Sequence, residues 1–308
     1  MPASLHITQL ALLSVALFLT SCKKTPDNEM PRGEGPLVVV AVNEPLRYFA
    51  ERIGGEAVMA SCPCPIDSDP ALWTPDSQAL ETFHSADIIL LNGADYARWT
   101  TVTSLPDSKL VNTSRGFQTD WLTMKETTVH RHGPEGEHSH EATIGEVWLD
   151  PELAIKQAER IERRLSALKP NQSVHFEQNL ARLKDELREV RASLRAAITK
   201  RPSKLFAAEP AFKYVARTVD QTVHHLAWNN VQQPSPTELD DLKKAVSSHT
   251  NAVFLLSTPP SQALQQVLDD ASIEYAVFDI AATTREKSYL ERMSENVRRL
   301  EQSLNHKR

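Results

Sequence analysis

The stretch NQSVHFEQNLARLKDELREVRASLRAAIT, residues 171–199, predicts one long helix that organises the rest of the chain. Its apolar side chains recur at steps of three and four residues, which places them on one face of a helix. They are Phe176, Leu180, Leu183, Leu187, Val190, Leu194 and Ile198. At about 1.5 Å per residue the helix is roughly 43 Å long, enough to run along two neighbouring lobes. The pattern favours a rigid strut packed on its own protein, although the same stripe would suit a coiled-coil seam with a partner.

Apolar runs that are typical of buried strands lie on both sides of this helix. Before it they are residues 37–42, 57–61, 87–92 and 109–112. After it they are residues 204–208, 222–227, 252–256 and 275–279. Continuous runs of Val, Ile and Leu suit parallel strands that helices cover on both faces. The predicted fold class is therefore α/β, with two doubly wound α/β lobes joined by a long rigid linking helix.

Three helix starts can be read from proline and capping residues. Thr74-Pro75 predicts a helix that Thr74 caps, with Pro75 in the first helical position. Ser235-Pro236-Thr237-Glu238 has the pattern of a capping box, and its proline again opens the helix. Asp150-Pro151 predicts a helix that runs to about Leu168, where Lys169-Pro170 ends it.

The N-terminus predicts export. Residues 5–19 form an uncharged apolar run that is short for a membrane-spanning helix, and Leu19-Thr20-Ser21-Cys22 follows it. Small residues before a cysteine in this position resemble a bacterial lipobox, which implies cleavage before Cys22 and a lipid anchor on it. An ordinary secretory signal or a retained anchor is the alternative. Residues 22–35 are polar with scattered Pro and Gly and are interpreted as a tether.

These patterns divide the chain into five parts. They are a signal peptide (1–21), a tether (22–35), an N-terminal lobe (36–168), a linking helix (169–200) and a C-terminal lobe (201–308). The predicted location is the outer side of a bacterial membrane, either the periplasmic face or the cell surface.

Composition and motifs exclude several functions. The 308 residues carry 34 Lys and Arg against 40 Asp and Glu, a net charge of −6, which gives no basic face for nucleic acid. Neither G-x-G-x-x-G nor G-x-x-x-x-G-K-[ST] occurs, so the common phosphate-binding loops are missing from the sequence. Neither G-x-S-x-G nor H-E-x-x-H occurs either. We therefore expect a protein that is not an enzyme.

The strongest chemical signal is HRHGPEGEHSHE, residues 130–141. Two H-x-H pairs, His130 with His132 and His138 with His140, flank a Gly-Pro-Glu-Gly turn. Imidazole nitrogens are common zinc ligands, and the glutamates between them would neutralise a dication. The segment predicts metal contact, either as direct ligands of a buried site or as a surface segment that gathers metal.

Cys62-Pro63-Cys64 contains the two remaining cysteines. In an exported protein they could form a disulfide. A metal role, or simply two small residues at a strand end, is the alternative, and the sequence leaves the three open.

The lipobox, the two lobes, the linking helix and the internal His-rich loop together resemble one family. It is the metal-specific substrate-binding lipoproteins of bacterial ABC importers, the zinc and manganese type. The resemblance covers about residues 36–304, with the local motifs ERIGG (51–55), SADIILLNG (85–93), VWLDP (147–151) and FDI (278–280). HGPEGEHSHE running into WLDP is similar to the zinc branch of that family.

The resemblance implies a metal site in the cleft between the lobes, where parallel sheets bind ligands. The family's ligands are three histidines and one or two carboxylates. The corresponding positions here are Ala71, Glu146, Glu209, Leu256 and Asp279. Ala71 and Leu256 cannot coordinate a metal, so the implied donors are three carboxylates.

The metal that the resemblance implies depends on the His-rich loop. Carboxylates alone favour hard cations such as Mn²⁺, Mg²⁺ or Ca²⁺. If His138 or His140 enters the cleft, a mixed site with Glu209 and Asp279 would suit zinc. The expected protein is a monomeric receptor that captures zinc and delivers it to an ABC permease and its ATPase. A degenerate relative that buffers metal or binds a protein partner is one alternative, and a metal-dependent enzyme with Glu146 or Glu209 as base is another.

Overall fold

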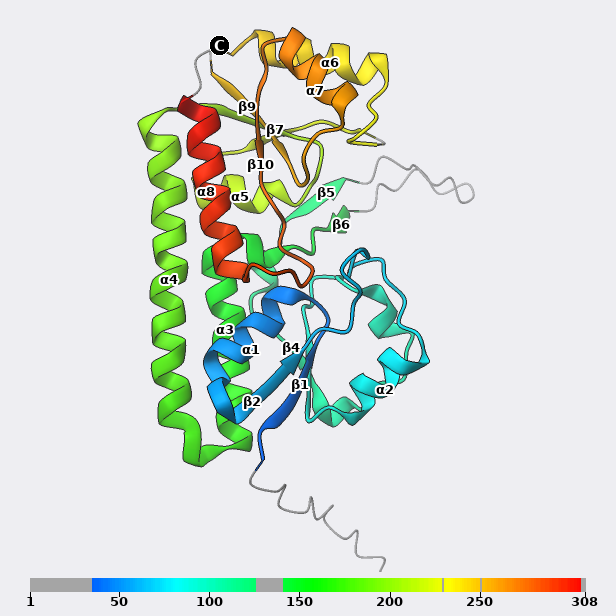
Figure 1. Cartoon of the computed structure of the whole chain (residues 1–308), viewed down its shortest axis with the longest axis vertical. Coiled ribbons are helices and arrows are strands. Elements are labelled where there is room, and N and C mark those ends of the chain that lie inside the picture. Colours follow the sequence, from blue (N-terminus) through cyan, green and yellow to red (C-terminus); the bar gives the residue numbers. More distant parts are fainter. Residues whose placement is uncertain (1–34, 126–140, 229, 250, 306–308) are drawn as a thin grey trace, which may run out of the picture. The chain divides into compact units, whose positions relative to one another are not determined.

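The computed structural model describes residues 35–125, 141–228, 230–249 and 251–305 (Figure 1). Residues Pro36–Arg308 form one compact unit. The predicted signal peptide, nearly all of the tether and the His-rich loop lie outside the described residues.

The first lobe is built on a parallel sheet with strand order β2-β1-β3-β4. The strands are β1 (Leu37–Ala41), β2 (Val58–Ser61), β3 (Ile88–Leu91) and β4 (Leu110–Asn112). Its helices are α1 (Glu44–Gly54), α2 (Ser77–Ser85) and α3 (Pro151–Leu168). Nearly every side chain of β1 and β3 is buried, which is why these strands appear in the sequence as continuous apolar runs.

The second lobe repeats the design, with a parallel sheet in the order β10-β9-β7-β8. Its strands are β7 (Lys204–Ala207), β8 (Val223–His225), β9 (Ala252–Leu256) and β10 (Glu274–Val277). Its helices are α5 (Phe212–Thr218), α6 (Pro236–Ser247) and α7 (Gln262–Asp270). All eight predicted strands are present, so the predicted fold class is confirmed.

The sequence analysis did not predict one small antiparallel hairpin. The strands β5 (Thr123–Lys125) and β6 (Glu141–Thr143) pair antiparallel, and Lys125 lies opposite Glu141. Residues 126–140 therefore leave and rejoin the described structure at one hairpin. Short 3₁₀ turns complete the fold: η1 (Gly55–Ala57), η2 (Arg98–Thr101), η3 (Asp107–Lys109), η4 (Gln118–Asp120), η5 (Val147–Leu149) and η6 (Pro170–Gln172).

The linking helix α4 (Ser173–Lys200) packs against α1 and α3 of the first lobe and against α8 (Tyr289–Asn305). Figure 1 shows α4 and α8 running alongside each other. Of the predicted apolar stripe, every member except the half-buried Leu180 is buried in this chain. The stripe is therefore used inside the protein, and a coiled-coil seam on that face is excluded.

The helix starts follow local chemistry, with one correction. The capping box of α6 is present, because Ser235 N donates to Glu238 Oε2 at 2.7 Å and Glu238 N donates to Ser235 Oγ at 3.3 Å. The helix predicted at Thr74-Pro75 instead begins at Ser77, because the carboxylate of Asp76 accepts the N–H of Ala79 at 2.8 Å. Asp is a stronger N-cap than Thr, and it decides the boundary.

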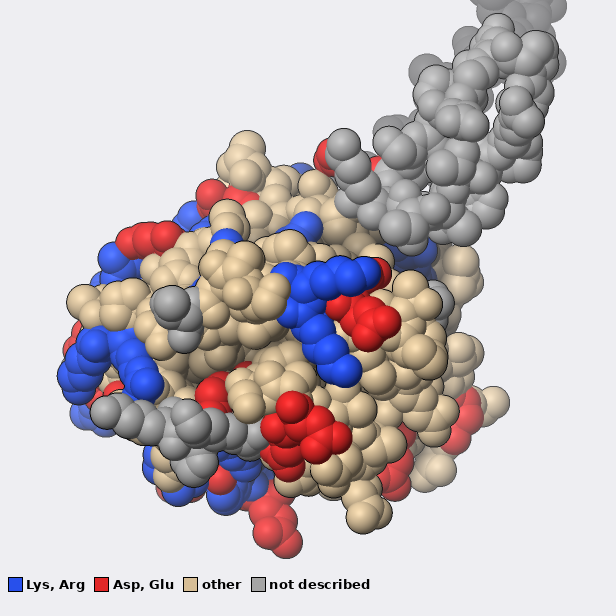
Figure 2. All heavy atoms as spheres, turned by 90° about the horizontal axis from the view of Figure 1, so that it is seen from above, with Lys and Arg blue, Asp and Glu red and all other residues tan. Residues whose placement is uncertain are grey.

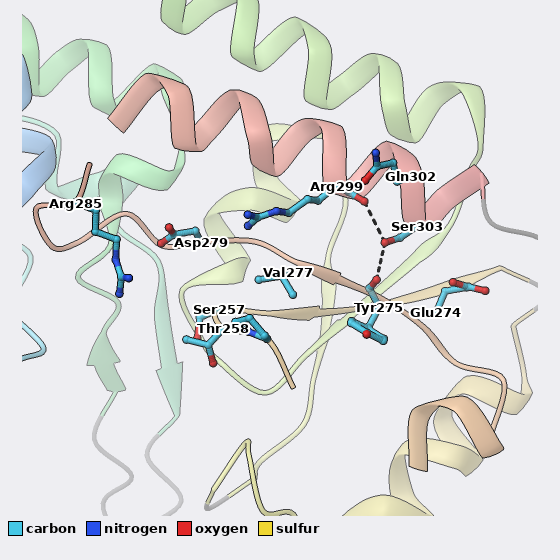
Figure 3. A pocket seen from close by; sticks show the side chains of 11 residues that line it. Ser257, Thr258, Glu274, Tyr275, Val277, Asp279, Arg285, Arg299, Gln302 and Ser303 are labelled. Atoms are coloured by element: carbon cyan, nitrogen blue, oxygen red, sulfur yellow. Dashed lines mark hydrogen bonds between the residues drawn. The ribbon is translucent and has the colours of Figure 1, made fainter. Parts of the chain in front are cut away.

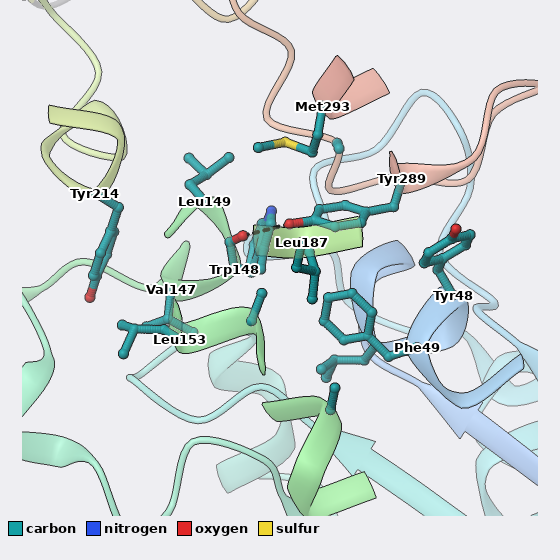
Figure 4. Close-up of a cluster of buried hydrophobic side chains, with 14 of the residues drawn as sticks. Tyr48, Phe49, Val147, Trp148, Leu149, Leu153, Leu187, Tyr214, Tyr289 and Met293 are labelled. Carbon is teal, nitrogen blue, oxygen red and sulfur yellow. Dashed lines mark hydrogen bonds between the residues drawn. The ribbon is translucent and has the colours of Figure 1, made fainter. Parts of the chain in front are cut away.

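A cluster of buried aromatic residues connects the second half of the chain to the first (Figure 4). Tyr289 of α8 packs edge-on against Phe49 of α1, with ring centroids 5.2 Å apart. Its hydroxyl donates to the carbonyl oxygen of Trp148 at 2.7 Å. Trp148 Nε1 in turn donates to the carbonyl oxygen of Ile280 at 2.8 Å. The WLDP motif thus fixes the segment after β10, which carries Asp279, to the first lobe.

The described surface has no region dominated by one charge on the face drawn in Figure 2, where acidic and basic side chains stand next to each other. Among the described residues, no helix has the length and apolarity needed to cross a membrane.

Candidate metal centre

Glu209 lies two residues after the end of β7 and is the best-formed donor of the site. Its Oε1 accepts two hydrogen bonds from Ser257, from the backbone N–H at 3.1 Å and from the hydroxyl at 2.7 Å. Its Oε2 is buried and has no hydrogen-bond partner among the described residues. Ser257 thus fixes the carboxyl group by one oxygen and leaves the other free. An unpaired buried oxygen is costly, so this atom calls for a partner, which a water molecule or a cation would supply.

Glu146 lies immediately before η5, on the side of the first lobe. Burial raises the pKa of its carboxyl group, and the negative charge of Asp69 raises it further. Close by, burial also raises the pKa of Tyr96 well above its usual value, and the Tyr96 hydroxyl has no hydrogen-bond partner among the described residues. A divalent cation would stabilise the charged form of Glu146, so binding would release a proton when the carboxyl is protonated.

The loop after β2 carries Ala71 where the resemblance implies a histidine. Ala71 N donates to Asp69 Oδ1 at 2.9 Å, and its side chain packs against the core. Leu256 is the last residue of β9 and is completely buried in the core of the second lobe. The polar residue that reaches the site from this strand is the next one, Ser257.

Asp279 follows β10, and an arginine holds it. Arg292 of α8 donates from Nη2 to Oδ1 at 2.7 Å and from Nε to Oδ2 at 2.8 Å. The N–H of Ala281 also donates to Oδ1, at 2.9 Å. Burial by itself would raise the pKa of Asp279, but the hydrogen bonds from Arg292 and Ala281 and the charges of Arg292 and Arg285 lower it below its usual value.

Asp279 also lines a cavity of about 650 Å³ at the ends of β9 and β10 (Figure 3). Ser257, Arg285 and Arg299 line the same cavity. Arg299 pairs with Glu295 of its own helix at 2.9 Å. The cavity therefore places two guanidinium groups near the carboxylate that the resemblance implies as a metal ligand.

The described donors do not make up a metal site on their own. Among the described residues, no group of three or more His, Cys, Asp or Glu side chains is arranged to hold a metal ion. Glu146, Glu209 and Asp279 therefore do not form a complete site by themselves. The predicted loop ligands His130, His132, His138 and His140, and the predicted lipidation site Cys22, lie outside the described residues.

The two cysteines near this region are both free thiols. Burial raises the pKa of Cys62 to about 12 and that of Cys64 to about 11. The Cys64 thiol lies 3.7 Å from the carbonyl oxygens of Pro65 and Ser68, within reach of a weak hydrogen bond. Thiols protonated to this degree are poor metal ligands and poor nucleophiles at neutral pH.

Sequence reasoning did not identify Ser257, Arg292 and Tyr96 as parts of this region. Ser257 lies 48 residues from Glu209 along the chain, and Arg292 lies 13 residues from Asp279. The one signal that the sequence offers is that Ser257 directly follows a predicted strand, where polar side chains gather at the sheet edge.

Comparison with known proteins gives the class. The manganese ABC transporter substrate-binding lipoprotein PsaA of Streptococcus pneumoniae is 24% identical over 277 residues, covering 86% of each chain. The zinc-binding protein AdcA of Streptococcus pyogenes is 24% identical over 262 residues, covering 79% of this chain and 50% of AdcA.

Solved structures show the same fold. The metal-dependent lipoprotein YcdH of Bacillus subtilis superposes with a TM-score of 0.73 at 20% identity, covering 87% of this chain and 99% of YcdH. The Zn(II)-bound ZnuA-like domain of Streptococcus pneumoniae AdcA gives a TM-score of 0.72 at 21% identity, covering 88% and 100%. These structures share with this chain two parallel sheets joined by a long helix. The family match gives the class, a substrate-binding component of a metal transporter, which is not an enzyme.

The family model for the periplasmic component A of zinc-uptake complexes, ZnuA, matches residues 39–303. The chain belongs to this family. Asp279, which the sequence resemblance implies as a ligand, is bound by Arg292.

Proposed function

We propose that this protein is a lipid-anchored receptor that captures zinc outside the cytoplasmic membrane and delivers it to an ABC permease and its ATPase. The lipid would be carried on Cys22. Glu209 and Glu146 would bind the ion together with histidines from residues 130–141, among them His138 and His140. Asp279 belongs to the same region, but its carboxylate oxygens already accept hydrogen bonds from Arg292, so they are less available to coordinate the ion.

The observation that carries this proposal is the carboxyl group of Glu209. One oxygen is held by two hydrogen bonds from Ser257, and the other is buried without a partner among the described residues. A donor that is already oriented loses little conformational entropy on binding an ion. A buried carboxyl oxygen with nothing to accept from is stabilised most by a cation.

The hairpin supports a contribution from the His-rich loop. Its strands β5 and β6 are fixed to α5, the helix that follows Glu209. Tyr214 of α5 accepts a hydrogen bond from Leu122 N and donates one to Ile144 O, both at 3.0 Å. Lys213 Nζ donates to Thr123 O at 3.0 Å. The described residues on both sides of the histidine-containing segment therefore contact α5, which begins three residues after Glu209.

The choice of zinc over manganese follows from donor chemistry. The relatives' names include both manganese and zinc binders. Carboxylates alone would favour Mn²⁺, whereas a mixture of imidazole and carboxylate donors favours Zn²⁺. With four histidines between β5 and β6, we propose zinc as the physiological ion.

A competitive metal titration read by native mass spectrometry tests the proposal. Soluble protein comprising residues 30–308 would be titrated with zinc and with manganese, alongside Glu209→Ala and a deletion of residues 130–141. Glu81→Ala is the matched control, because Glu81 is an exposed carboxylate on α2 that takes no part in the hydrogen bonds described for Glu146, Glu209 and Asp279. One tight zinc per chain, lost in Glu209→Ala and kept in Glu81→Ala, would support the proposal.

A second candidate function is favoured by the Asp279–Arg292 pair and by Ala71. In this reading the chain is a family member whose cleft has lost its ion, and residues 130–141 alone buffer metal. It predicts weak binding of several ions, abolished by the deletion and unaffected by Glu209→Ala.

A further inference from the structure

We propose that Arg292 is an internal cation that competes with the metal for Asp279 and thereby sets the metal affinity of the cleft. The proposal rests on the proposed function, because it takes a divalent metal ion as the ligand of the cleft. Arg292 occupies the electrostatic role at Asp279 that a metal ion would otherwise have, and Asp279 is not a donor to the ion in the unmodified protein.

The geometry of the pair supports this role. The guanidinium group of Arg292 binds Asp279 through two parallel hydrogen bonds, at 2.7 and 2.8 Å, one to each carboxylate oxygen. With the bond from Ala281 N, Oδ1 already accepts two hydrogen bonds. Bidentate pairs of this kind are among the strongest that side chains form. A metal would have to share or displace a bound guanidinium group.

Arg292 is also fixed in place. Its third nitrogen, Nη1, donates to the carbonyl oxygen of Thr283 at 2.6 Å, and the residue is only 4% exposed. It reaches Asp279 from α8, and Asp279 also lines the cavity (Figure 3). The three hydrogen bonds and the burial of Arg292 therefore hold its guanidinium group against the carboxylate.

A second positive charge reinforces the first. Arg285 is exposed, lines the same cavity as Asp279, and lowers the pKa of that carboxyl group by its charge. A dication that approaches Asp279 thus meets one carboxylate and two guanidinium groups. Both guanidinium charges oppose the approach of a divalent ion to this carboxylate.

Asp279 would keep its position without Arg292. Its backbone N–H donates to Asn296 Oδ1 at 2.8 Å, and Asn296 Nδ2 donates to its carbonyl oxygen at 2.8 Å. The side chain retains the bond from Ala281 N. Removing Arg292 therefore frees an oriented carboxylate, and the expected result is tighter metal binding rather than weaker.

The test uses the full-length chain in detergent and a competition titration of zinc against a fluorescent chelator. The proteins are the wild type, Arg292→Met, Asp279→Ala and the double variant. Arg298→Met is the matched control, because Arg298 lies on the same helix and is exposed. Arg292→Gln is a second variant in case the methionine variant does not fold, as judged by far-UV circular dichroism and thermal unfolding.

Arg292→Met or Arg292→Gln should tighten zinc binding at least tenfold, and Asp279→Ala should remove that gain in the double variant. Asp279→Ala alone should change the wild-type affinity less than threefold. The proposal is overturned if a folded Arg292 variant binds zinc no more tightly than the wild type, or if Asp279→Ala abolishes wild-type binding. Tight binding by Arg292→Met with none by the wild type would uphold this proposal and overturn the proposed function. Wild-type zinc binding that depends on Glu209 and does not change in Arg292→Met would uphold the proposed function and overturn this proposal.

Discussion

Tyr289→Phe removes one hydroxyl group from the centre of the molecule and leaves the ring. Tyr289 is completely buried, and its hydroxyl is 2.7 Å from the carbonyl oxygen of Trp148. The edge-on contact with Phe49, at 5.2 Å between ring centroids, does not involve the hydroxyl and should persist. The variant therefore isolates a single hydrogen bond between α8 and the WLDP segment.

The magnitude follows from what the substitution leaves behind. A buried carbonyl oxygen that loses its donor costs about 1–3 kcal/mol. The free energy of unfolding of Tyr289→Phe should fall by that amount in urea, with an unchanged dependence on urea concentration, because the folded core stays intact. The midpoint should shift while the slope does not.

Tyr275→Phe is the matched control. Tyr275 is half-buried on β10 and packs against the core of the second lobe, and its carbonyl oxygen, not its hydroxyl, accepts a bond from Ser303. Removing the hydroxyl group of Tyr275 should change the free energy of unfolding by less than about 0.5 kcal/mol. Equal losses in the two variants would refute the claim that the Tyr289–Trp148 bond connects α8 to the first lobe.

Three further predictions concern the site and the core. The folded-state pKa of Glu146 is raised, so ionising this carboxyl group destabilises the folded protein. This destabilisation is absent below the unfolded pKa near 4.3, grows as the pH rises above it and is complete above the folded pKa. Metal-free Glu146→Gln should therefore be more stable than the wild type at pH 7.5 and equal to it at pH 4, and equal stabilities at both pH values in thermal unfolding would count against the buried carboxyl. With pKa values of about 12 and about 11, Cys62 and Cys64 should be alkylated at pH 8 roughly a hundred times more slowly in the folded protein than in urea, and rapid labelling of the folded protein would contradict these raised pKa values. Leu187→Ala in α4 should lower the free energy of unfolding by about 2–5 kcal/mol, since Leu187 is completely buried, and a loss below about 1 kcal/mol would show that the stripe is loosely packed.

The fold was predictable because its determinants are local. Parallel strands covered on both faces leave continuous apolar runs such as that of β1, and α4 leaves an apolar stripe with helical spacing. The capping box of α6 is likewise written in four consecutive residues. The hairpin β5–β6 leaves no such signal, because each strand has three residues and their partners are separated by the His-rich loop.

The candidate site was predictable only in part. Glu209 and Asp279 could be placed because they follow strands, and the carboxyl ends of parallel strands meet at one edge of a sheet. Their partners depend on tertiary packing. Nothing in the sequence shows that Ser257 orients Glu209, or that Arg292 approaches Asp279 across the β10–α8 connection. The pairing of an implied ligand with a buried arginine is therefore visible only in the structure.

The most direct test of the central claim is an anomalous diffraction map at the zinc edge, from crystals of the protein grown with one equivalent of zinc. The account predicts one strong peak about 2.0–2.2 Å from Oε2 of Glu209, with nitrogen ligands completing the coordination and Asp279 still bound to Arg292. A zinc peak bound only by residues 130–141, with Glu209 uncoordinated, would contradict it.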